Sequence, residues 1–447
     1  MTSDTIIVGG GIGGLSLLHR LRNEGKEAIL LEKSERLGGV VLTREAPWGG
    51  LVDLGPNTLR GASDDLASLI DELELRDRVV APDPAAKSRF VLNSGRLTEV
   101  PSSPRSLLET DLLSVRGKAR LLREPFVGKG SNPVESVAAF VKRRFGSEVL
   151  DRLVDPLVTG IYAGDPDALS LAATFPLLSD IEQEHRSLLV GALKRLKKRK
   201  NGDRGVVDRL PRIFSFDAGI GALVERLVER NRDAIRTGEV VVRIDRVGDR
   251  WQVTTSDATY EAASVVLTTD APTTAGLIET FEPKTAAALC TIVHAPVAVV
   301  VLAYDRESYA KIPKGFGVLV PSREKRDVLG VIFASRLFPD RSPEDLATLT
   351  VMIGGVRRPE LVGRSDEELR AIATEGVASI FEDRLVPVDA LCQRWLPGIP
   401  QYGTAHRAVV AGIEQCERAN PGLRLCGSYR GGVSMADRIT PSPTKGA

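Results

Sequence analysis

The stretch TIIVGGGIGGLSLLHRLRNEGKEAILLEKSERLGG, residues 5–39, has the pattern of a strand, a glycine-rich turn, a helix and a second strand. Its β-branched start is typical of a central parallel strand. Gly9, Gly11 and Gly14 then fit G-x-G-x-x-G: the first permits a tight turn, the second lets backbone approach a pyrophosphate, and the third allows close helix–strand packing. Glu32 ends the second strand, where a carboxylate accepts hydrogen bonds from ribose hydroxyls. These parts in register predict a dinucleotide-binding unit, and the acid at position 32 disfavours a 2′-phosphate.

The next residues, EKSERLGGVVLT, place Arg36, Gly38 and Gly39 directly after the ribose-binding acid. This extension resembles the motif of the flavoprotein superfamily that includes amine oxidases, phytoene desaturases and protoporphyrinogen oxidases, and the resemblance implies FAD. A second fingerprint for NAD(P)H is not expected, because FDAGIGALVERL (216–227) has Val224 where a third glycine would pack. The substrate therefore supplies the reducing equivalents, and dioxygen or another acceptor reoxidises the flavin.

The predicted FAD contacts come from the fingerprint, its extension, a Gly-Pro turn, a later strand and a C-terminal glycine turn. They are Gly9, Gly11, Gly13, Gly14, Glu32, Lys33, Arg36, Gly38, Gly39, Gly55, Pro56, Asn57, Val241, Gly427, Ser428, Gly432, Val433 and Ser434.

Composition narrows the class of protein. The 447 residues are 43% hydrophobic and carry 60 Lys and Arg against 59 Asp and Glu, so there is no general reason to expect a nucleic-acid partner. The four cysteines form no CxxC pair, which suits a reducing compartment and disfavours zinc. No apolar run approaches the roughly 18 residues of a membrane span, and the early first strand leaves no room for a signal peptide. We expect a cytoplasmic protein, and the basic run 193–205 leaves peripheral contact with a membrane surface open.

Changes in pattern along the chain predict an α/β protein: an interrupted Rossmann-type FAD-binding domain, an antiparallel-sheet substrate domain and a helical insertion. The predicted parts are 1–85, FAD-binding; 86–205, the helical insertion facing substrate or membrane; 206–275, FAD-binding; 276–393, the substrate sheet; and 394–447, FAD-binding.

Several segments resemble the protoporphyrinogen oxidase family in particular. They are VDLGPNTL (52–59), DPLVTGIYAGDPDALSL (155–171), MIGGVRRPEL (352–361), RWLPGIPQY (394–402) and LCGSYRGGVSM (425–435). The resemblance implies six-electron oxidation of protoporphyrinogen IX in haem biosynthesis, or of coproporphyrinogen III in one branch of the family. Family members usually continue with a long helix, whereas TPSPTKGA (440–447) contains helix-stopping prolines, so we expect a shortened cover over the flavin.

The predicted chemistry needs no catalytic side chain, because hydride passes to the flavin and the protein positions the macrocycle. The four histidines are scattered, so each is interpreted as structural and no metal site is expected. A tetrapyrrole bearing carboxylates favours an apolar pocket with basic residues at its mouth. The candidate substrate contacts are Arg60, for a propionate, with Leu157, Ile161, Tyr162, Met352 and Gly354 as walls, although core packing accounts for several of them equally well.

Three alternatives stay open at this stage. A flavin amine oxidase is disfavoured because SYRGGVSM supplies only Tyr429 of an expected aromatic pair. A carotenoid desaturase would normally be longer than this chain. A flavin-binding protein without turnover is the third, and a homodimer is also left open.

Overall fold

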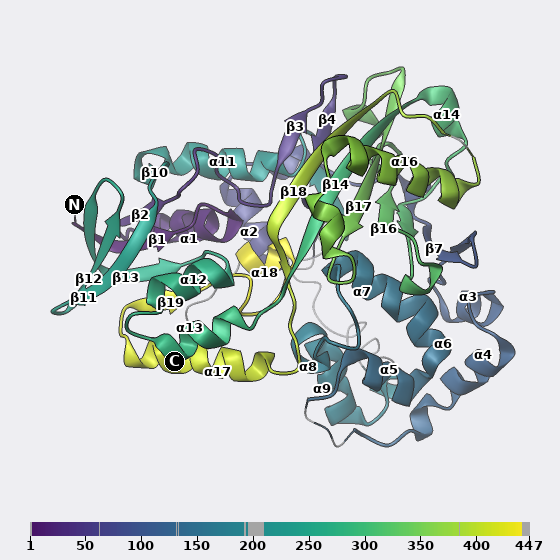
Figure 1. The fold of residues 1–447 in the computed structure, drawn as a ribbon, viewed down its shortest axis with the longest axis horizontal. Helices are drawn as coiled ribbons and strands as arrows, with labels where there is room; N and C mark the ends of the chain where they lie inside the picture. The colour runs from purple at the N-terminus through teal and green to yellow at the C-terminus, as the bar shows by residue number, and fades with distance from the viewer. Residues whose placement is uncertain are drawn as a thin grey trace.

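The computed structural model describes residues 2–61, 63–130, 132, 134–191, 194, 210–383 and 385–439. Its described strands form two seven-stranded sheets and two smaller ones, with a group of helices below the second large sheet (Figure 1). The basic run 193–205, except residue 194, and the tail 440–447 lie outside the described residues, and so do the expectations attached to them. Within the described ranges, no helix combines the length and apolarity needed to cross a membrane.

The first large sheet runs in the order β10-β2-β1-β13-β12-β11, with β19 beside β13. β1, β2, β10, β13 and β19 are parallel, and β11 and β12 are antiparallel. The strand bounds are β1 Thr2–Val8, β2 Ala28–Leu31, β10 Ile235–Arg236, β11 Val241–Val247, β12 Arg250–Thr255, β13 Thr259–Leu267 and β19 Leu423–Leu425. The sheet thus collects strands from distant parts of the chain, which confirms the predicted α/β fold with an interrupted nucleotide-type sheet.

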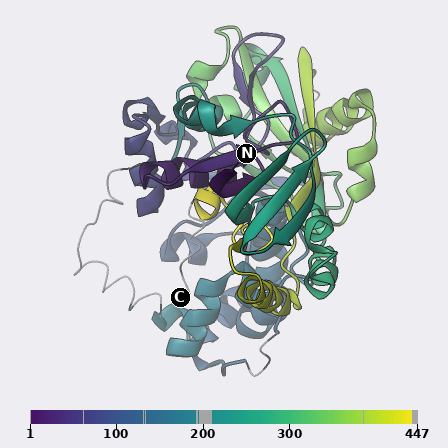
Figure 2. The ribbon, with the colours of Figure 1, turned by 90° about the vertical axis from the view of Figure 1, so that its left-hand side faces the viewer.

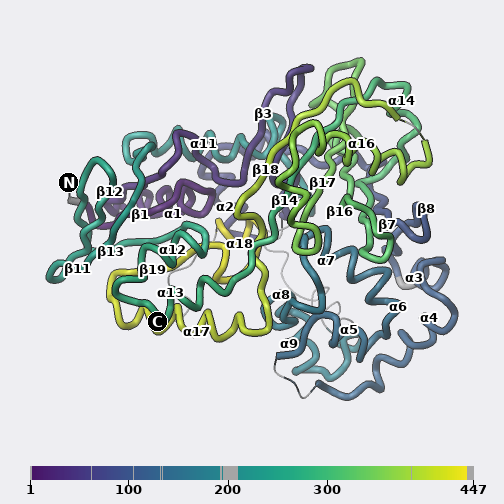
Figure 3. The backbone as a smooth tube through the Cα atoms, in the orientation of Figure 1, coloured from purple at the N-terminus to yellow at the C-terminus, as the bar shows by residue number. Residues whose placement is uncertain are grey.

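Helices cover both faces of this sheet, which explains why the first strand ends in a continuous apolar run, Ile6 to Val8. Ile7 points into one core cluster and Ile6 into another, and both side chains are fully buried. On one side lie α1 Ile12–Asn23, α2 Asp64–Glu72, α11 Gly221–Asn231 and α18 Met435–Ile439; on the other lie α12 Ala271–Ile278, α13 Pro283–Cys290 and α17 His406–Ala419. α18 contacts both α1 and α2, so the last described helix returns beside the first one (Figure 3).

The second large sheet runs in the order β18-β14-β17-β16-β15-β7-β8 and lies behind the first sheet in Figure 2. Its strands are β7 Arg89–Asn93, β8 Arg96–Glu99, β14 His294–Asp305, β15 Gly317–Leu319, β16 Val328–Ile332, β17 Leu346–Gly354 and β18 Asp389–Pro400. α16 Asp366–Phe381 packs against β14, β16, β17 and β18. Of the short helices, α14 Arg306–Ala310 contacts β14 and β17, and α15 Ala334–Leu337 contacts β17.

This sheet differs from the expectation in one respect. Residues 89–99, which the sequence analysis placed in the helical insertion, form the hairpin β7–β8, and β7 pairs in parallel with β15. The turn at Ser94 and Gly95, both with positive φ, allows the hairpin, but only the long-range pairing decides which sheet it joins. The sheet is therefore mixed rather than purely antiparallel.

Two small sheets join the larger ones. The first contains β3 Thr43–Glu45 and β4 Leu51–Asp53, and the second contains β5 Leu59–Arg60, β6 Val79–Val80 and β9 Ile213–Phe216. They carry the chain from the glycine-rich turn towards the second large sheet.

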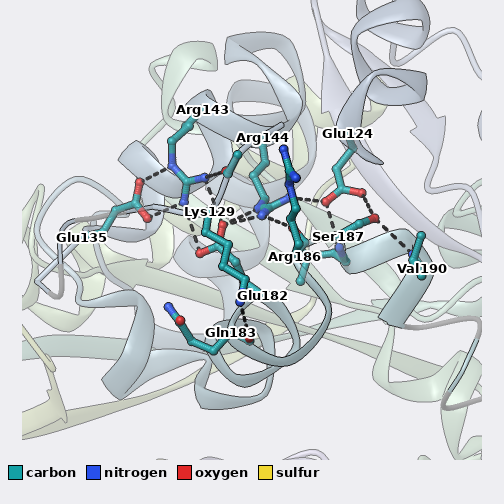
Figure 4. Close-up of polar contacts among 12 residues, drawn as sticks. Glu124, Lys129, Glu135, Arg143, Arg144, Glu182, Gln183, Arg186, Ser187 and Val190 are labelled. Atoms are coloured by element: carbon teal, nitrogen blue, oxygen red, sulfur yellow. Dashed lines mark hydrogen bonds and ion pairs between the residues drawn. The ribbon is translucent and has the colours of Figure 1, made fainter. Parts of the chain in front are cut away.

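The helical insertion is held by a buried network of charges (Figure 4). Its helices are α3 Pro104–Glu109, α4 Val115–Leu122, α5 Val137–Phe145, α6 Ser147–Val149, α7 Asp155–Tyr162, α8 Leu171–Thr174 and α9 Pro176–His185. Arg144 is fully buried and donates to Glu124 at 2.5 Å and to Glu182 at 2.7 Å. Glu124 also accepts hydrogen bonds from the Ser187 hydroxyl at 2.6 Å and the Leu188 amide at 2.8 Å. Because each buried charge has several partners, the network can lie in the interior.

Candidate functional site

The glycine-rich turn after β1 has the shape needed to hold a phosphate. Gly9 adopts φ +112°, a value that glycine accepts without strain. A Cβ on Gly14 would lie 2.0 Å from the Gly9 carbonyl oxygen, so this close approach of helix to turn requires glycine. α1 begins after Gly11 with no side-chain cap, and the first amides of the helix are therefore available to an anion.

Glu32 closes the same turn from the end of β2. Its carboxylate accepts the Gly10 amide at 2.6 Å and the Ser34 amide at 2.9 Å. These two hydrogen bonds fix the carboxylate at the cleft edge, and each oxygen keeps a free lone pair for a ligand hydroxyl.

Arg36 forms its hydrogen bonds within the segment that follows it. Arg36 donates to the carbonyl oxygens of Leu37 at 3.1 Å and Val41 at 3.2 Å, and also to that of Gly39. Its guanidinium lies over the Trp395 ring, 5.8 Å from the centroid, and burial lowers the pKa of Arg36. The side chain therefore shapes the wall of the cleft, and its predicted position along a ligand stays a prediction.

These pieces enclose a long cleft with about 1760 Å³ of empty space, its open mouth included. The predicted residues that line it are Gly9, Gly11, Gly13, Glu32, Lys33, Arg36, Gly38, Gly39, Val241 and Ser428. Gly14, Gly55, Pro56, Asn57, Gly427, Gly432, Val433 and Ser434 do not line it.

Sequence reasoning missed several lining residues. They are Glu239, Val240, Thr268, Thr269, Asp270, Thr273, His294, Trp395, Leu396, Pro397, Gly398, Cys426 and Arg438. Thr268, Thr269 and Asp270 follow the carboxyl end of β13, where ligands of open α/β sheets bind, so the position of that strand could have identified them. The segment 395–398 comes from the second sheet, and no local signal links it to the glycine turn.

His294 lines the cleft, and one hydrogen bond fixes which of its ring nitrogens carries the proton. Its Nδ1 lies 3.0 Å from the Ile292 carbonyl oxygen, so Nδ1 carries the proton of the neutral ring. Burial lowers the pKa of His294, and its Nε2 has no hydrogen-bond partner among the described residues. The ring therefore borders the cleft with an acceptor nitrogen that is itself buried.

The Gly-Pro turn at 55–57 lies directly behind the cleft wall. A Cβ on Gly55 would be 1.9 Å from the carbonyl oxygen of Val40, a lining residue. The Leu54 carbonyl accepts the Trp395 indole N–H at 2.7 Å, and Asn57 donates to Gly55 at 2.8 Å. The turn thus supports the wall from outside the cleft.

The C-terminal glycine turn is fixed largely by its own neighbours. The Tyr402 hydroxyl donates to the Ser428 carbonyl at 2.6 Å, and Arg438 donates to the Gly427 carbonyl at 2.8 Å. Asp437 accepts both the amide and the hydroxyl of Ser434, at 3.1 Å and 2.6 Å. The polar groups of Ser434 are therefore engaged within the protein.

The candidate substrate residues are dispersed. Tyr162 is buried, donates from its hydroxyl to the Thr174 carbonyl at 3.1 Å, and has its pKa raised by burial to about 12, so it belongs to the core of the helical insertion rather than to a pocket wall. Leu157 and Ile161 are 41% and 46% exposed on α7. Gly354 packs against Val362, since a Cβ there would lie 2.4 Å from that side chain.

Met352, by contrast, lies in an apolar cluster that reaches the cleft. This floor cluster consists of Ala163, Ala295, Val297 and Val299, with Leu329, Met352, Val356, Trp395 and Ile399 packed against them. Trp395 also lines the cleft, so the apolar face of the second sheet and the cleft meet at one side chain.

Basic side chains lie near the small sheet. Arg60 is exposed at the end of β5, where it pairs with Ile213 next to Arg212. Desolvation and the nearby charge of Arg212 lower the pKa of Arg89, whose guanidinium lies 4.9 Å from the Phe316 ring centroid. Among the ion pairs of the described residues, none involves Arg60, Arg89 or Arg212. Among all residues that the structure describes, no group of three or more histidine, cysteine or carboxylate side chains is arranged to hold a metal.

Known proteins resemble this chain over nearly all of its length. The family model described as flavin containing amine oxidoreductase matches residues 12–437. The chain is 32% identical to protoporphyrinogen oxidase of Homo sapiens over 469 residues, which covers 98% of this chain and 96% of the relative. It is 30% identical to protoporphyrinogen oxidase 2, chloroplastic/mitochondrial, of Arabidopsis thaliana over 464 residues, covering 97% and 91%.

Solved structures agree with these matches. A protein of Exiguobacterium sp. 255-15, provisionally named a protoporphyrinogen oxidase, superposes with a TM-score of 0.81 at 25% identity, covering 98% of this chain and 96% of that one. Cyclohexylamine oxidase from Brevibacterium oxydans IH-35A has a TM-score of 0.70 at 18% identity and covers 98% and 96%, which indicates a shared fold alone.

Proposed function

The chain belongs to the flavin containing amine oxidoreductase family, and from that premise we propose that it oxidises protoporphyrinogen IX to protoporphyrin IX with dioxygen as acceptor. This membership confirms the family resemblance that the sequence motifs indicated. Because the family is described as flavin containing, the cofactor is FAD. The full-length relatives named protoporphyrinogen oxidase favour this substrate over an amine.

The cleft has the donors and acceptors that FAD requires. We assign the pyrophosphate to the amides that follow Gly11, the adenosine ribose to Glu32 and the adenine to backbone near Val241, all of which border the cleft. The observation that Gly14 has no room for a side chain supports this assignment, since it is the packing that the fingerprint requires. When bound, FAD accepts hydride from the substrate and passes the electrons to dioxygen.

The observation that carries the proposal is the junction at Trp395. A porphyrinogen is a large, mostly apolar ring, and the floor cluster offers an apolar surface where the second sheet meets the cofactor cleft. Arg60, together with Arg89 and Arg212, supplies cations for the ring's carboxylates. These residues would orient the macrocycle and exclude water from its reacting carbon.

Coproporphyrinogen III is the second candidate substrate, because it presents the same ring with more carboxylates. The group formed by Arg60, Arg89 and Arg212 is compatible with either substrate. The number of carboxylates that the site accommodates decides between them.

The test is to purify the protein, record its flavin spectrum and follow porphyrin fluorescence after adding each porphyrinogen separately under air. Protein stripped of flavin gives the background of spontaneous oxidation. We expect fluorescence to grow well above that background with protoporphyrinogen IX. Growth with coproporphyrinogen III alone would assign the alternative, and peroxide released only with amines would assign an amine oxidase. A yellow protein that leaves all rates at background would indicate a flavin-binding protein without turnover.

A further inference from the structure

A buried ion pair between Asp53 and Arg341 joins the two large parts of the molecule. Asp53 ends β4, and Arg341 ends a short helical turn, Pro339–Arg341, that belongs to the second sheet. Their side chains are 4% and 11% exposed, and Arg341 donates to Asp53 at 2.7 Å. Both side chains also form hydrogen bonds with other segments of the chain.

Each charge is satisfied by further hydrogen bonds. The other oxygen of Asp53 accepts the Thr43 hydroxyl at 2.5 Å and the Ile220 amide at 3.0 Å. Arg341 also donates to the Ser215 hydroxyl at 2.6 Å and to the Phe216 carbonyl at 2.5 Å. The pair thus ties β3, β4, β9 and the start of α11 to the second sheet.

Asp53 lies just before the turn that supports the wall of the cleft. Asp53 is followed by Leu54, which is bonded to Trp395, and by Gly55, which lies against the Val40 wall. The turn behind the cofactor cleft is therefore attached to the second sheet at two successive residues. One attachment is the indole hydrogen bond, and the other is the ion pair.

Apolar packing joins the same segments, because Val52 and Leu54 are buried in a cluster with Val301, against which Leu391 also packs. A cavity of about 20 Å³, room for about one water, lies beside the ion pair, and Asp53, Asn57, Arg341, Thr348 and Thr350 are among the residues that line it. Because apolar contacts are not directional, the hydrogen-bonded ion pair is the contact that fixes how these segments are oriented. Buried ion pairs can often be replaced by apolar groups with little loss of stability. We therefore attribute to this pair a role in fixing the arrangement of the segments that it joins.

We propose that Asp53 and Arg341 are positioning residues, which hold the Gly55–Asn57 turn and the Val40 wall at a fixed distance from the floor cluster. They set where the flavin end of the cleft lies relative to the substrate surface, without touching either ligand. The proposal rests on bound FAD, and only its kinetic readout depends on the proposed substrate.

The test compares Arg341→Met, Asp53→Asn and the double variant with wild type in the FAD-loaded protein. Asp217→Asn is the matched control, because Asp217 follows Phe216 on the same segment and acts on Arg341 only through its charge, while its own partner is the exposed Arg78. Three quantities are measured: FAD content, the visible circular dichroism of the flavin, and the rate of flavin reduction by porphyrinogen.

We expect the single variants to keep FAD, to change the visible circular dichroism, and to lower the reduction rate by up to about 100-fold, the scale of a misplacement near 1 Å. The double variant should be no worse than either single one, and Arg341→Lys should restore part of the loss. If Arg341→Met does not fold, Asp53→Asn and Arg341→Lys carry the comparison.

If the variants melt at a lower temperature but keep the wild-type circular dichroism of the flavin, the proposal is wrong. The ion pair would then stabilise the fold without positioning the cleft wall. Loss of FAD from the variants would also overturn it. Since the dichroism needs no porphyrinogen, its result stands even if the proposed substrate is wrong.

Discussion

Alanine in place of each glycine of the fingerprint separates what the fold needs from what the cofactor needs. A Cβ on Gly14 would lie 2.0 Å from the Gly9 carbonyl oxygen and 2.9 Å from the Thr268 hydroxyl. Neither a backbone carbonyl nor a buried strand end can retreat easily, so α1 must move away from β1. Overpacking of this kind costs about 3 kcal/mol, the upper end of the usual range. We expect Gly14→Ala to melt earlier than wild type even without FAD.

Gly11 and Gly13 have room within the protein. The nearest atom to a Cβ on Gly11 is the Gly39 Cα at 4.0 Å, and for Gly13 it is the Arg438 carbonyl at 3.4 Å. Both substitutions should leave the flavin-free protein as stable as wild type. If the pyrophosphate lies against Gly11, a methyl group there costs about 1–3 kcal/mol of binding, roughly tenfold to a hundredfold in Kd.

The assay removes flavin, measures thermal unfolding of each variant with and without added FAD, and titrates FAD by fluorescence. Gly412→Ala is the matched control, because Gly412 lies in α17 outside the cleft lining and a Cβ there would meet nothing within 4 Å. A Gly14→Ala protein as stable as wild type would refute the contact argument. A Gly11→Ala protein that binds FAD as tightly as Gly412→Ala would refute the placement of the pyrophosphate.

Three further predictions concern stability. Arg144→Met leaves Glu124 and Glu182 buried without their counter-charge and should lower the free energy of unfolding by about 3–5 kcal/mol in a urea titration, whereas a loss below about 1 kcal/mol would contradict the reasoning. Burial raises the pKa of Glu182, but hydrogen bonds from two arginines outweigh it, so its pKa lies below 4.5. The stability from Glu182 is therefore present above the unfolded pKa and is lost as pH falls through the folded pKa, so Glu182→Gln should flatten the dependence of melting temperature on pH in the acid range below 4.5. Ser365 and Glu368 form a capping box at the start of α16, so Ser365→Ala should cost about 1 kcal/mol by the same titration, and an unchanged midpoint would dismiss the cap.

Local sequence signals predicted the first sheet and one end of the cleft well. Residues 5–39 contain their own strands, turn and helix, and the physical requirements of a close helix–strand contact fix the glycines. The strands β11–β13 were also predictable, because the hairpin alternates apolar and polar residues along 241–267. These features depend on neighbours within about thirty residues.

Contacts between distant segments were not predictable. Nothing near residue 89 indicates that its strand pairs with Gly317, since a parallel partner is chosen by the whole sheet. No local signal marks Trp395, yet it lines the cleft, donates to Leu54 and lies against Arg36. One side chain makes all three contacts only after the second sheet has docked on the first.

The position of the cleft follows from the way the two sheets are joined. Parallel strands bring their carboxyl ends to one edge, so the residues after β1, β2 and β13 gather there although the last lies far along the chain. That edge alone supplies amides and a carboxylate, which suit a nucleotide and offer nothing to an apolar ring. The apolar surface comes from β14, β17 and β18, and it reaches the same edge through Trp395. A fold that holds the cofactor with one sheet and the substrate with another must control the distance between them, and the two attachments at residues 53 and 54 lie where that control is needed.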